Sequence, residues 1–289
     1  MKRIASFLLI ALLLAGCGSN PSKAPEATTQ EVTQAVIQET TQPATFPTET
    51  EAPTVTVDAV TVPEEVVGIA ESVITGQQKT VHVSTADEFL SAIAPDTEIV
   101  VDAQLIDFST AADYGKSGGE YYRWDDPYDG PELIIQNVQN VTVRGGGEAR
   151  TDNTLSCVPR YADVLTFENC SNIYVTHISL GHTQEPGYCM GGVLNFTNSE
   201  KILVEDCDLY GCGTLGVIGD FSLDIQVINN RIHDCSVGGV EFSSCQNVRV
   251  DGNTFENLGD EWNEETGIEA PIFRLFTSEN VTCNGEEVR

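Results

Sequence analysis

The chain has 289 residues, of which 44 are acidic and 14 are basic, so its formal net charge is −30 at pH 7. Such a surface repels nucleic acid and anionic lipid, and it repels anionic polysaccharides unless a cation bridges them. Neutral glycans, cationic groups and Ca²⁺ are the electrostatically permitted partners.

Residues 1–17 have the pattern of a targeting segment. Lys2 and Arg3 precede an apolar run from Ile4 to Leu14 that is too short to span a bilayer. The run ends in Leu14-Ala15-Gly16-Cys17, which resembles the lipobox of bacterial lipoproteins. That resemblance implies lipidation of Cys17 and an extracytoplasmic protein anchored to a bacterial membrane, at the cell surface or on its periplasmic face. An ordinary signal peptide with a chance cysteine is the alternative, and the small residues before Cys17 favour the lipobox.

Residues 18–78 are rich in Thr, Pro, Gln, Glu and Val and have almost no aromatic side chains. A segment of this composition buries too little apolar surface to offset its ordering entropy, so it is predicted to be a disordered stalk. Residues 79–289 then form one domain, which contains 35 acidic and 11 basic residues and so carries a charge of −24.

The domain begins with a predicted strand from Lys79 to Val83. The next residues, Thr85 to Glu88, form a capping-box pattern that opens a short amphipathic helix. Pro95 ends that helix, and a strand is expected from Thr97 to Val101. The helix is expected to plug the end of whatever structure follows it.

A repeat dominates the rest of the chain. A Gly-aliphatic pair is followed by an aliphatic-x-aliphatic pair, and the anchors Ile202, Ile225 and Val248 are each separated by 23 residues. Short alternating strands with this period predict a coil of stacked parallel strands, with rungs that begin near Glu132. The full set of anchors is Val141, Ile173, Ile202, Ile225, Val248 and Val281.

Asn230 and Asn253 share one position of the repeat. With the repeat itself, this asparagine pair resembles the right-handed parallel β-helix group that includes pectate lyases and polygalacturonases. The resemblance covers about residues 80–289 and implies an all-β solenoid of about six rungs with an N-terminal capping helix. It does not specify activity, because lyases, hydrolases, adhesins and inert scaffolds share this architecture.

Eight cysteines follow Cys17. Cys212 and Cys235 occupy matching positions on adjacent rungs, where a disulfide would fit, whereas Cys170 and Cys245 lie three rungs apart and are too distant. Stacked thiols in the interior are expected for most of these residues. None is expected to be a nucleophile or metal ligand, because there is no Cys-x-x-Cys and no Cys/His cluster.

Three steps of the repeat are longer than 23 residues, and their extra residues lie within Gly145–Asp163, Gly181–Gly191 and Leu258–Gly267. Because position within the repeat corresponds to position around the coil, all three are expected to project from one side, where they form the walls of a groove wide enough for one sugar chain. The residues expected to bind substrate there are Arg160, Tyr161, Asp163, Tyr210, Glu261 and Trp262. Those expected to act as acid or base are His182, Glu185, His233 and Asp234. Solvated surface charge is the alternative for each of them.

The signatures of the related enzymes are incomplete. Gly181-His182-Thr183 keeps only part of the Gly-His-Gly of polygalacturonases, without a nearby Asp-Asp pair. Two acidic groups, one at Asp125, Asp126 and Asp129 and one at Glu205, Asp206 and Asp208, could bind Ca²⁺, although they match no known calcium loop.

Two apolar features remain. An aromatic group before the first rung is expected to cover the coil, and Leu165, Leu194 and Ile218 are interpreted as an outward apolar column that is either covered or a partner interface. The aromatic group consists of Tyr114, Tyr121, Tyr122, Trp124 and Tyr128.

Three functions are compatible with these patterns. The first is a membrane-anchored, monomeric β-helix lipoprotein that binds polysaccharide or other glycan of the envelope or the environment. The second is a polysaccharide lyase or glycoside hydrolase. The third is a structural spacer or adhesin.

Overall fold

The structure is a computed structural model that describes residues 73–182, 190–211 and 213–288. The chain divides into units 1–58 and 59–289, and all described residues belong to the second. Cys17 and the predicted stalk up to residue 72 lie outside them. No helix in the described part of the chain is long and apolar enough to cross a membrane.

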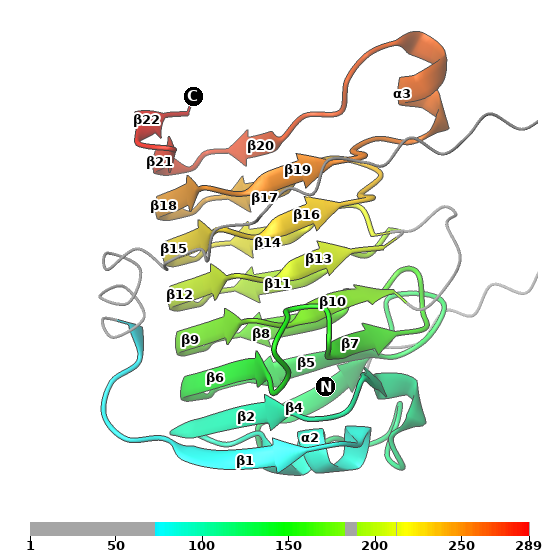
Figure 1. Cartoon of the computed structure of the whole chain (residues 1–289), viewed down its shortest axis with the longest axis vertical. Coiled ribbons are helices and arrows are strands. Elements are labelled where there is room, and N and C mark those ends of the chain that lie inside the picture. The colour runs from blue at the N-terminus through cyan, green and yellow to red at the C-terminus, as the bar shows by residue number, and fades with distance from the viewer. Residues whose placement is uncertain (1–72, 183–189, 212, 289) are drawn as a thin grey trace, which may run out of the picture. The chain divides into compact units, whose positions relative to one another are not determined.

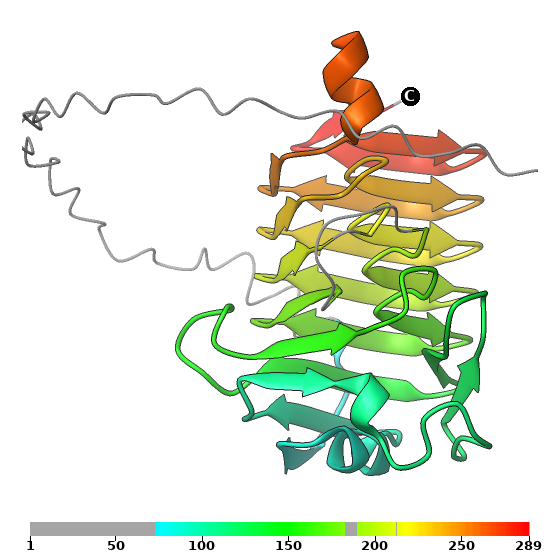
Figure 2. The same ribbon diagram turned by 90° about the vertical axis from the view of Figure 1, so that its right-hand side faces the viewer.

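Three sheets, which we call A, B and C, contain the described strands and wrap around one core (Figures 1 and 2). Sheet A stacks one strand per coil, and neighbouring strands are parallel except for the final pair, β21 and β22. Its strands are β1 (Lys79–Val83), β2 (Thr97–Val101), β6 (Gln139–Gly145), β9 (Ser171–Thr176), β12 (Glu200–Glu205), β15 (Leu223–Ile228), β18 (Gln246–Asp251), β21 (Glu279–Cys283) and β22 (Glu286–Glu287).

Each coil passes from sheet A to sheet B and then to sheet C, so the molecule has an A–B, a B–C and a C–A corner. Sheet B contains β3 (Leu105–Asp107), β7 (Thr154–Cys157), β10 (Ser179–His182), β13 (Asp208–Tyr210), β16 (Arg231–His233) and β19 (Thr254–Glu256). Sheet C contains β4 (Tyr122–Asp125), β5 (Glu132–Gln136), β8 (Leu165–Glu168), β11 (Leu194–Thr197), β14 (Val217–Asp220), β17 (Val240–Ser243) and β20 (Phe273–Phe276), and only β4 is antiparallel.

The predicted parallel solenoid is confirmed, and its regular steps are those of sheet A, where Ile202 pairs with Ile225 and Ile225 with Val248. Sheet A also starts earlier than Glu132, because Thr97 of β2 pairs with Val141 of β6. The long connection between these two strands carries β3, the short 3-10 helix η1 (Phe108–Thr110) and β4, and it hides the period.

The predicted capping helix is α2 (Ala86–Ala92). Thr85 accepts a hydrogen bond from the Glu88 amide, and the Glu88 carboxylate accepts one from the Ser84 amide, which is the reciprocal pattern of a capping box. Phe89 is fully buried and packs against Phe108 at 5.2 Å between ring centroids. The helix therefore closes the first coil, as expected.

The predicted outward column is wrong for Leu165 and Leu194. Both are fully buried and alternate with the buried Phe167 and Phe196, so they face the core. Leu194 pairs with Val217, and Ile218 is the next residue along its strand and so faces outward. The Gly-aliphatic pairs suggested an alignment that is off by one residue here, and a one-residue shift moves a side chain to the opposite face.

Two internal ladders connect the coils. Asn253 accepts hydrogen bonds from the amide of Asn230, which in turn accepts one from the amide of Cys207, as the shared repeat position predicted. At the C–A corner, the hydroxyl groups of Ser199, Ser222 and Ser278 each accept a hydrogen bond from a backbone amide of the preceding coil. Five of the described cysteines are free thiols, which agrees with the interior thiols predicted, and Cys189 and Cys212 lie outside the described residues. They are Cys170, Cys207, Cys235, Cys245 and Cys283.

The extra residues of the three longer steps do not all lie at one corner of the coil. Residues 190–193 and 257–272 lie at the B–C corner, but residues 146–153 connect β6 to β7 at the A–B corner. The prediction of one-sided insertions is therefore wrong for the first of them. A step length counts the extra residues in a coil, but it does not say at which of the coil's corners they lie.

A short segment before β1 runs along the outer face of sheet A. Val73 packs on Leu203 and Ile228, and its carbonyl accepts a hydrogen bond from Asn172 at 2.5 Å. Further along, Gln78 donates to the carbonyl of Asn140 at 2.9 Å. We call residues 73–78 the strap; the described structure thus begins six residues before Lys79.

Candidate functional site

The outward face of sheet C carries a row of polar side chains. Because alternate residues of a strand face opposite sides, Thr166, Asn195 and Asp220 point outward between the buried residues of β8, β11 and β14. Thr166 pairs directly with Asn195 on the next coil. The face therefore presents a hydroxyl and an amide group in register, whereas Asn195 pairs with Ile218 on the next coil and the Asp220 carboxyl group lies two residues further along β14.

A pair of acidic side chains begins this face. Glu132 starts β5, and Asp163 ends the turn between β7 and β8. The Thr166 hydroxyl lies 2.8 Å from one oxygen of Glu132 and 3.5 Å from one oxygen of Asp163, so one hydroxyl sits between the two carboxyl groups. The Asp163 amide donates to Glu132 at 3.1 Å, and Asn195 donates to Asp163 at 2.7 Å.

The environments of these groups shift their protonation. Burial and the neighbouring charge of Asp163 raise the pKa of Glu132 to about 7. Burial, together with the charges of Glu241 and Asp163, also raises the pKa of Asp220. The outward face of sheet C thus carries a carboxyl group with a raised pKa beside a second carboxyl group, an arrangement that suits proton transfer.

Two exposed tyrosines stand beside the pair. Tyr128 is 76% exposed and Tyr161 is 40% exposed, and their ring centroids are 4.7 Å apart. The carboxylate of Asp129 fixes their relative position by accepting hydrogen bonds from the amides of Arg160 and Tyr161, at 2.8 and 3.0 Å. The other members of the predicted aromatic group, Tyr114, Tyr121, Tyr122 and Trp124, are partly buried against the core and cover the coil, as predicted.

His182 lies close to this turn but inside the B–C corner. Its side chain is almost fully buried, and Nε2 contacts the carbonyl of Ala162 at 2.9 Å. A carbonyl only accepts, so Nε2 carries the proton, and burial lowers the pKa of the ring. In this arrangement His182 supports the turn that carries Arg160, Tyr161 and Asp163 rather than facing solvent.

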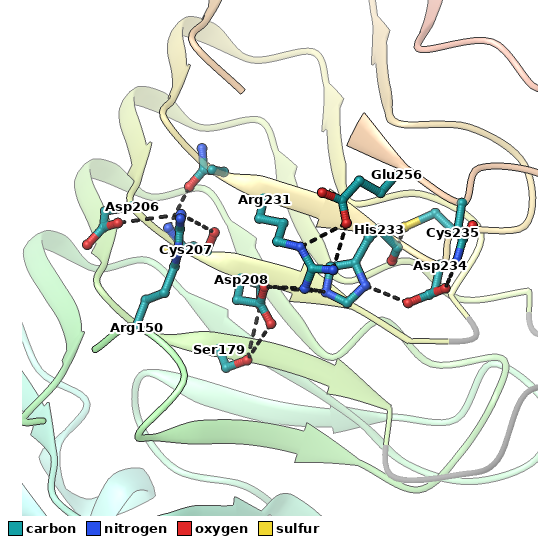
Figure 3. Close-up of polar contacts among 12 residues, drawn as sticks. Arg150, Ser179, Asp206, Cys207, Asp208, Arg231, His233, Asp234, Cys235 and Glu256 are labelled. Carbon is teal, nitrogen blue, oxygen red and sulfur yellow. Dashed lines mark hydrogen bonds and ion pairs between the residues drawn. The ribbon is translucent and has the colours of Figure 1, made fainter. Parts of the chain in front are cut away.

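Tyr210 and His233 stack on the outer face of sheet B, with centroids 5.7 Å apart (Figure 3 shows the groups around His233). They pair in register on β13 and β16, and Glu256 follows on β19. The Tyr210 ring covers Gly181, where any added side chain would collide with it.

His233 belongs to a closed network of charges (Figure 3). Arg231 donates to Nε2 of His233 at 2.9 Å and contacts the buried Asp208 at 3.3 Å and Glu256 at 2.7 Å. A guanidinium only donates, so the ring proton is on Nδ1, which contacts Asp234 at 2.5 Å. Burial raises the pKa of Asp234, but hydrogen bonds from His233 and Asn257 outweigh it and the net shift is downward. This network neutralises the buried Asp208 and leaves His233 only 11% exposed.

The remaining predicted residues are not placed at either cluster. Glu185 and Cys17 lie outside the described residues. Glu261 and Trp262 begin the helix α3 (Glu261–Thr266), and nothing is described of their side chains. The structure therefore brings Arg160, Tyr161, Asp163 and His182 together at one corner, and Tyr210, His233 and Asp234 together on sheet B.

The acidic groups considered for Ca²⁺ are dispersed. Glu205 accepts a hydrogen bond from Tyr174 at 2.7 Å, whereas Asp206 contacts His177 at 2.6 Å and Asp208 faces Arg231. Within the described ranges, no three His, Cys, Asp or Glu side chains are grouped so that they could hold a metal ion.

Sequence reasoning missed Glu132, Thr166 and Asp220. Asp220 follows the Gly-aliphatic pair of its coil by three residues and alternates with buried positions. The sequence pattern could therefore have predicted that its side chain points outward. Glu132 gave no such signal, because it reaches Thr166 across an irregular step of 32 residues.

These features define a right-handed parallel β-helix protein. The model of the family described as the right handed beta helix region matches residues 133–270. No curated protein matches the sequence.

Three solved structures are similar to this chain. A protein of Parabacteroides merdae, provisionally assigned as a glycosyl hydrolase, is 10% identical, with 71% of this chain and 96% of that chain covered and a TM-score of 0.40. A mutant pectate lyase of Bacillus subtilis is 11% identical, with 73% and 82% covered and a TM-score of 0.30. A thermostable pectate lyase is 12% identical, with 63% and 76% covered and a TM-score of 0.25. These likenesses concern the fold alone.

Proposed function

We propose that the domain binds a neutral polysaccharide chain along the outward face of sheet C. The observation that carries the proposal is the pair of exposed tyrosines, Tyr128 and Tyr161, held beside the Glu132–Asp163 pair. An aromatic ring offers the apolar face on which a sugar ring packs, while neighbouring amides and carboxyl groups bond its hydroxyls. The domain's charge of −24 favours a neutral chain over an anionic one.

The proposal includes the location. The lipobox at Cys17 supports a lipid anchor on a bacterial membrane, and the segment that follows supports a spacer between that membrane and the coil. The polysaccharide would then belong to the cell envelope or to its surroundings. A monomer suffices, because the face lies on one chain.

A glycan panel tests the binding. The full chain should bind neutral polysaccharides, and Tyr161→Ala should weaken that binding about tenfold because one stacking ring is lost. The matched control is Leu105→Ala, which removes an exposed apolar side chain (52% exposed) on sheet B and should bind like the wild type. Absence of any ligand, with and without Ca²⁺, contradicts the proposal.

A second function, polysaccharide cleavage, is favoured by one observation, the pKa of about 7 at Glu132 beside Asp163. Such a pair can supply a general acid and a general base. Glu132→Gln should then lower the release of reducing or unsaturated ends by about a hundredfold or more. Glu279→Gln, an exposed position on sheet A away from both clusters, is the control.

The same assay separates the two clusters. If His233→Ala abolishes cleavage and Glu132→Gln does not, the chemistry belongs to the network around His233. His182→Ala is expected to act through folding of the turn at Arg160, so its loss of activity should accompany a loss of thermal stability.

A further inference from the structure

The C–A corner repeats one backbone conformation on every coil. The residue that follows the sheet C strand is left-handed, with φ values of 54° at Asn169, 49° at Asn198, 50° at Phe221, 54° at Ser244 and 51° at Thr277. The amides of the first four bond the next coil in the same way, which confirms that these positions are equivalent. Asparagine tolerates this conformation best among residues with a side chain.

Phe221 departs from this pattern. A bulky aromatic residue is strained in the left-handed region, and the ring is 64% exposed, so it gains little from burial. Leu223, two residues later, is also 39% exposed. Neither the turn nor the core requires a phenylalanine here, since Asn198 makes the same turn one coil earlier. A residue that costs stability and gains little packing points to a role in binding.

The ring borders a hollow of about 300 Å³. Phe221 and Leu223 form its apolar side, while Asn169, Asn198 and Glu200 line it with amide and carboxylate groups. The volume is at the lower end of that of small-molecule sites, which corresponds to one sugar ring rather than to an extended ligand. Two exposed apolar side chains are too few for a stable protein interface, which buries several hundred square ångströms on each partner.

We propose that this hollow is a second carbohydrate subsite, in which one neutral pyranose ring stacks on Phe221 and bonds Asn169, Asn198 and Glu200 through its hydroxyls. It lies at the C–A corner, whereas Tyr161 lies at the B–C corner. The inference rests on the proposed function only in taking carbohydrate as the ligand class.

The test is the substitution Phe221→Asn in the full chain, probed by calorimetric titration with neutral hexaoses of glucose, xylose and mannose. The variant should unfold at a higher temperature, because asparagine relieves the strained turn, and yet bind the hexaose about tenfold more weakly. The matched control is Ser244→Asn, which changes the equivalent turn one coil later and should leave binding unchanged.

Other results of this experiment would overturn the subsite, the proposed function or both. A lower unfolding temperature with unchanged binding makes Phe221 a packing residue and overturns the subsite. Binding lost in Tyr161→Ala but retained in Phe221→Asn overturns the subsite and keeps the proposed function; the reverse result overturns the proposed face and keeps the subsite. If no hexaose binds the wild type, both fail, and altered sedimentation of Phe221→Asn would then assign the patch to self-association.

Discussion

The protonation of Glu132 links the candidate site to stability. Its pKa of about 7 in the folded protein lies above the ordinary value of 4.5, because the side chain is buried next to Asp163. Between these two values the folded state holds a proton that the unfolded state has released. Stability must therefore fall as the pH rises through this window.

Glu132→Gln removes that dependence. Relative to the wild type, the variant should gain on the order of 1–3 kcal/mol in free energy of unfolding between about pH 5 and about pH 8. Urea titrations at both pH values measure the difference. An equal stability difference at the two pH values would contradict a raised pKa at Glu132.

At the scale of elements, the helix α2 depends on a small number of local contacts. It is a single short helix whose first turn depends on the Thr85 and Glu88 contacts, and it covers the core through Phe89. Its loss would expose the first coil, whereas a strand within a sheet is held by neighbours on both sides.

Thr85→Ala should therefore destabilise the domain by about 1 kcal/mol, since an N-cap side chain is lost. Chemical denaturation measures the effect, and Thr85→Ser, which keeps the hydroxyl, should restore most of it. A larger loss in Thr85→Ser than in Thr85→Ala would show that the methyl group, not the cap, matters.

At the scale of the molecule, the structure of the regular repeats could be predicted from the sequence, whereas the structure of the irregular steps could not. The even steps at Ile202, Ile225 and Val248 predicted sheet A and its register, and the positions of Tyr210 and His233 followed from them. The side on which Leu194 lies depends on a single residue of register, which a repeat with variable turns does not fix. The contact between Glu132 and Thr166 depends on how a 32-residue step folds back.

The strap would be the first part of the domain to bear a pulling force that is applied to the chain upstream of Val73. Tension arriving from upstream of Val73 meets the hydrogen bonds of Asn172 and Asn140 and the packing of Val73 before it reaches β1. These contacts lie one after another along the outer face of sheet A, so they break in sequence, while the strands beneath remain paired. Because each broken contact releases a little chain, the strap can lengthen under load before the first strand of the coil is pulled away.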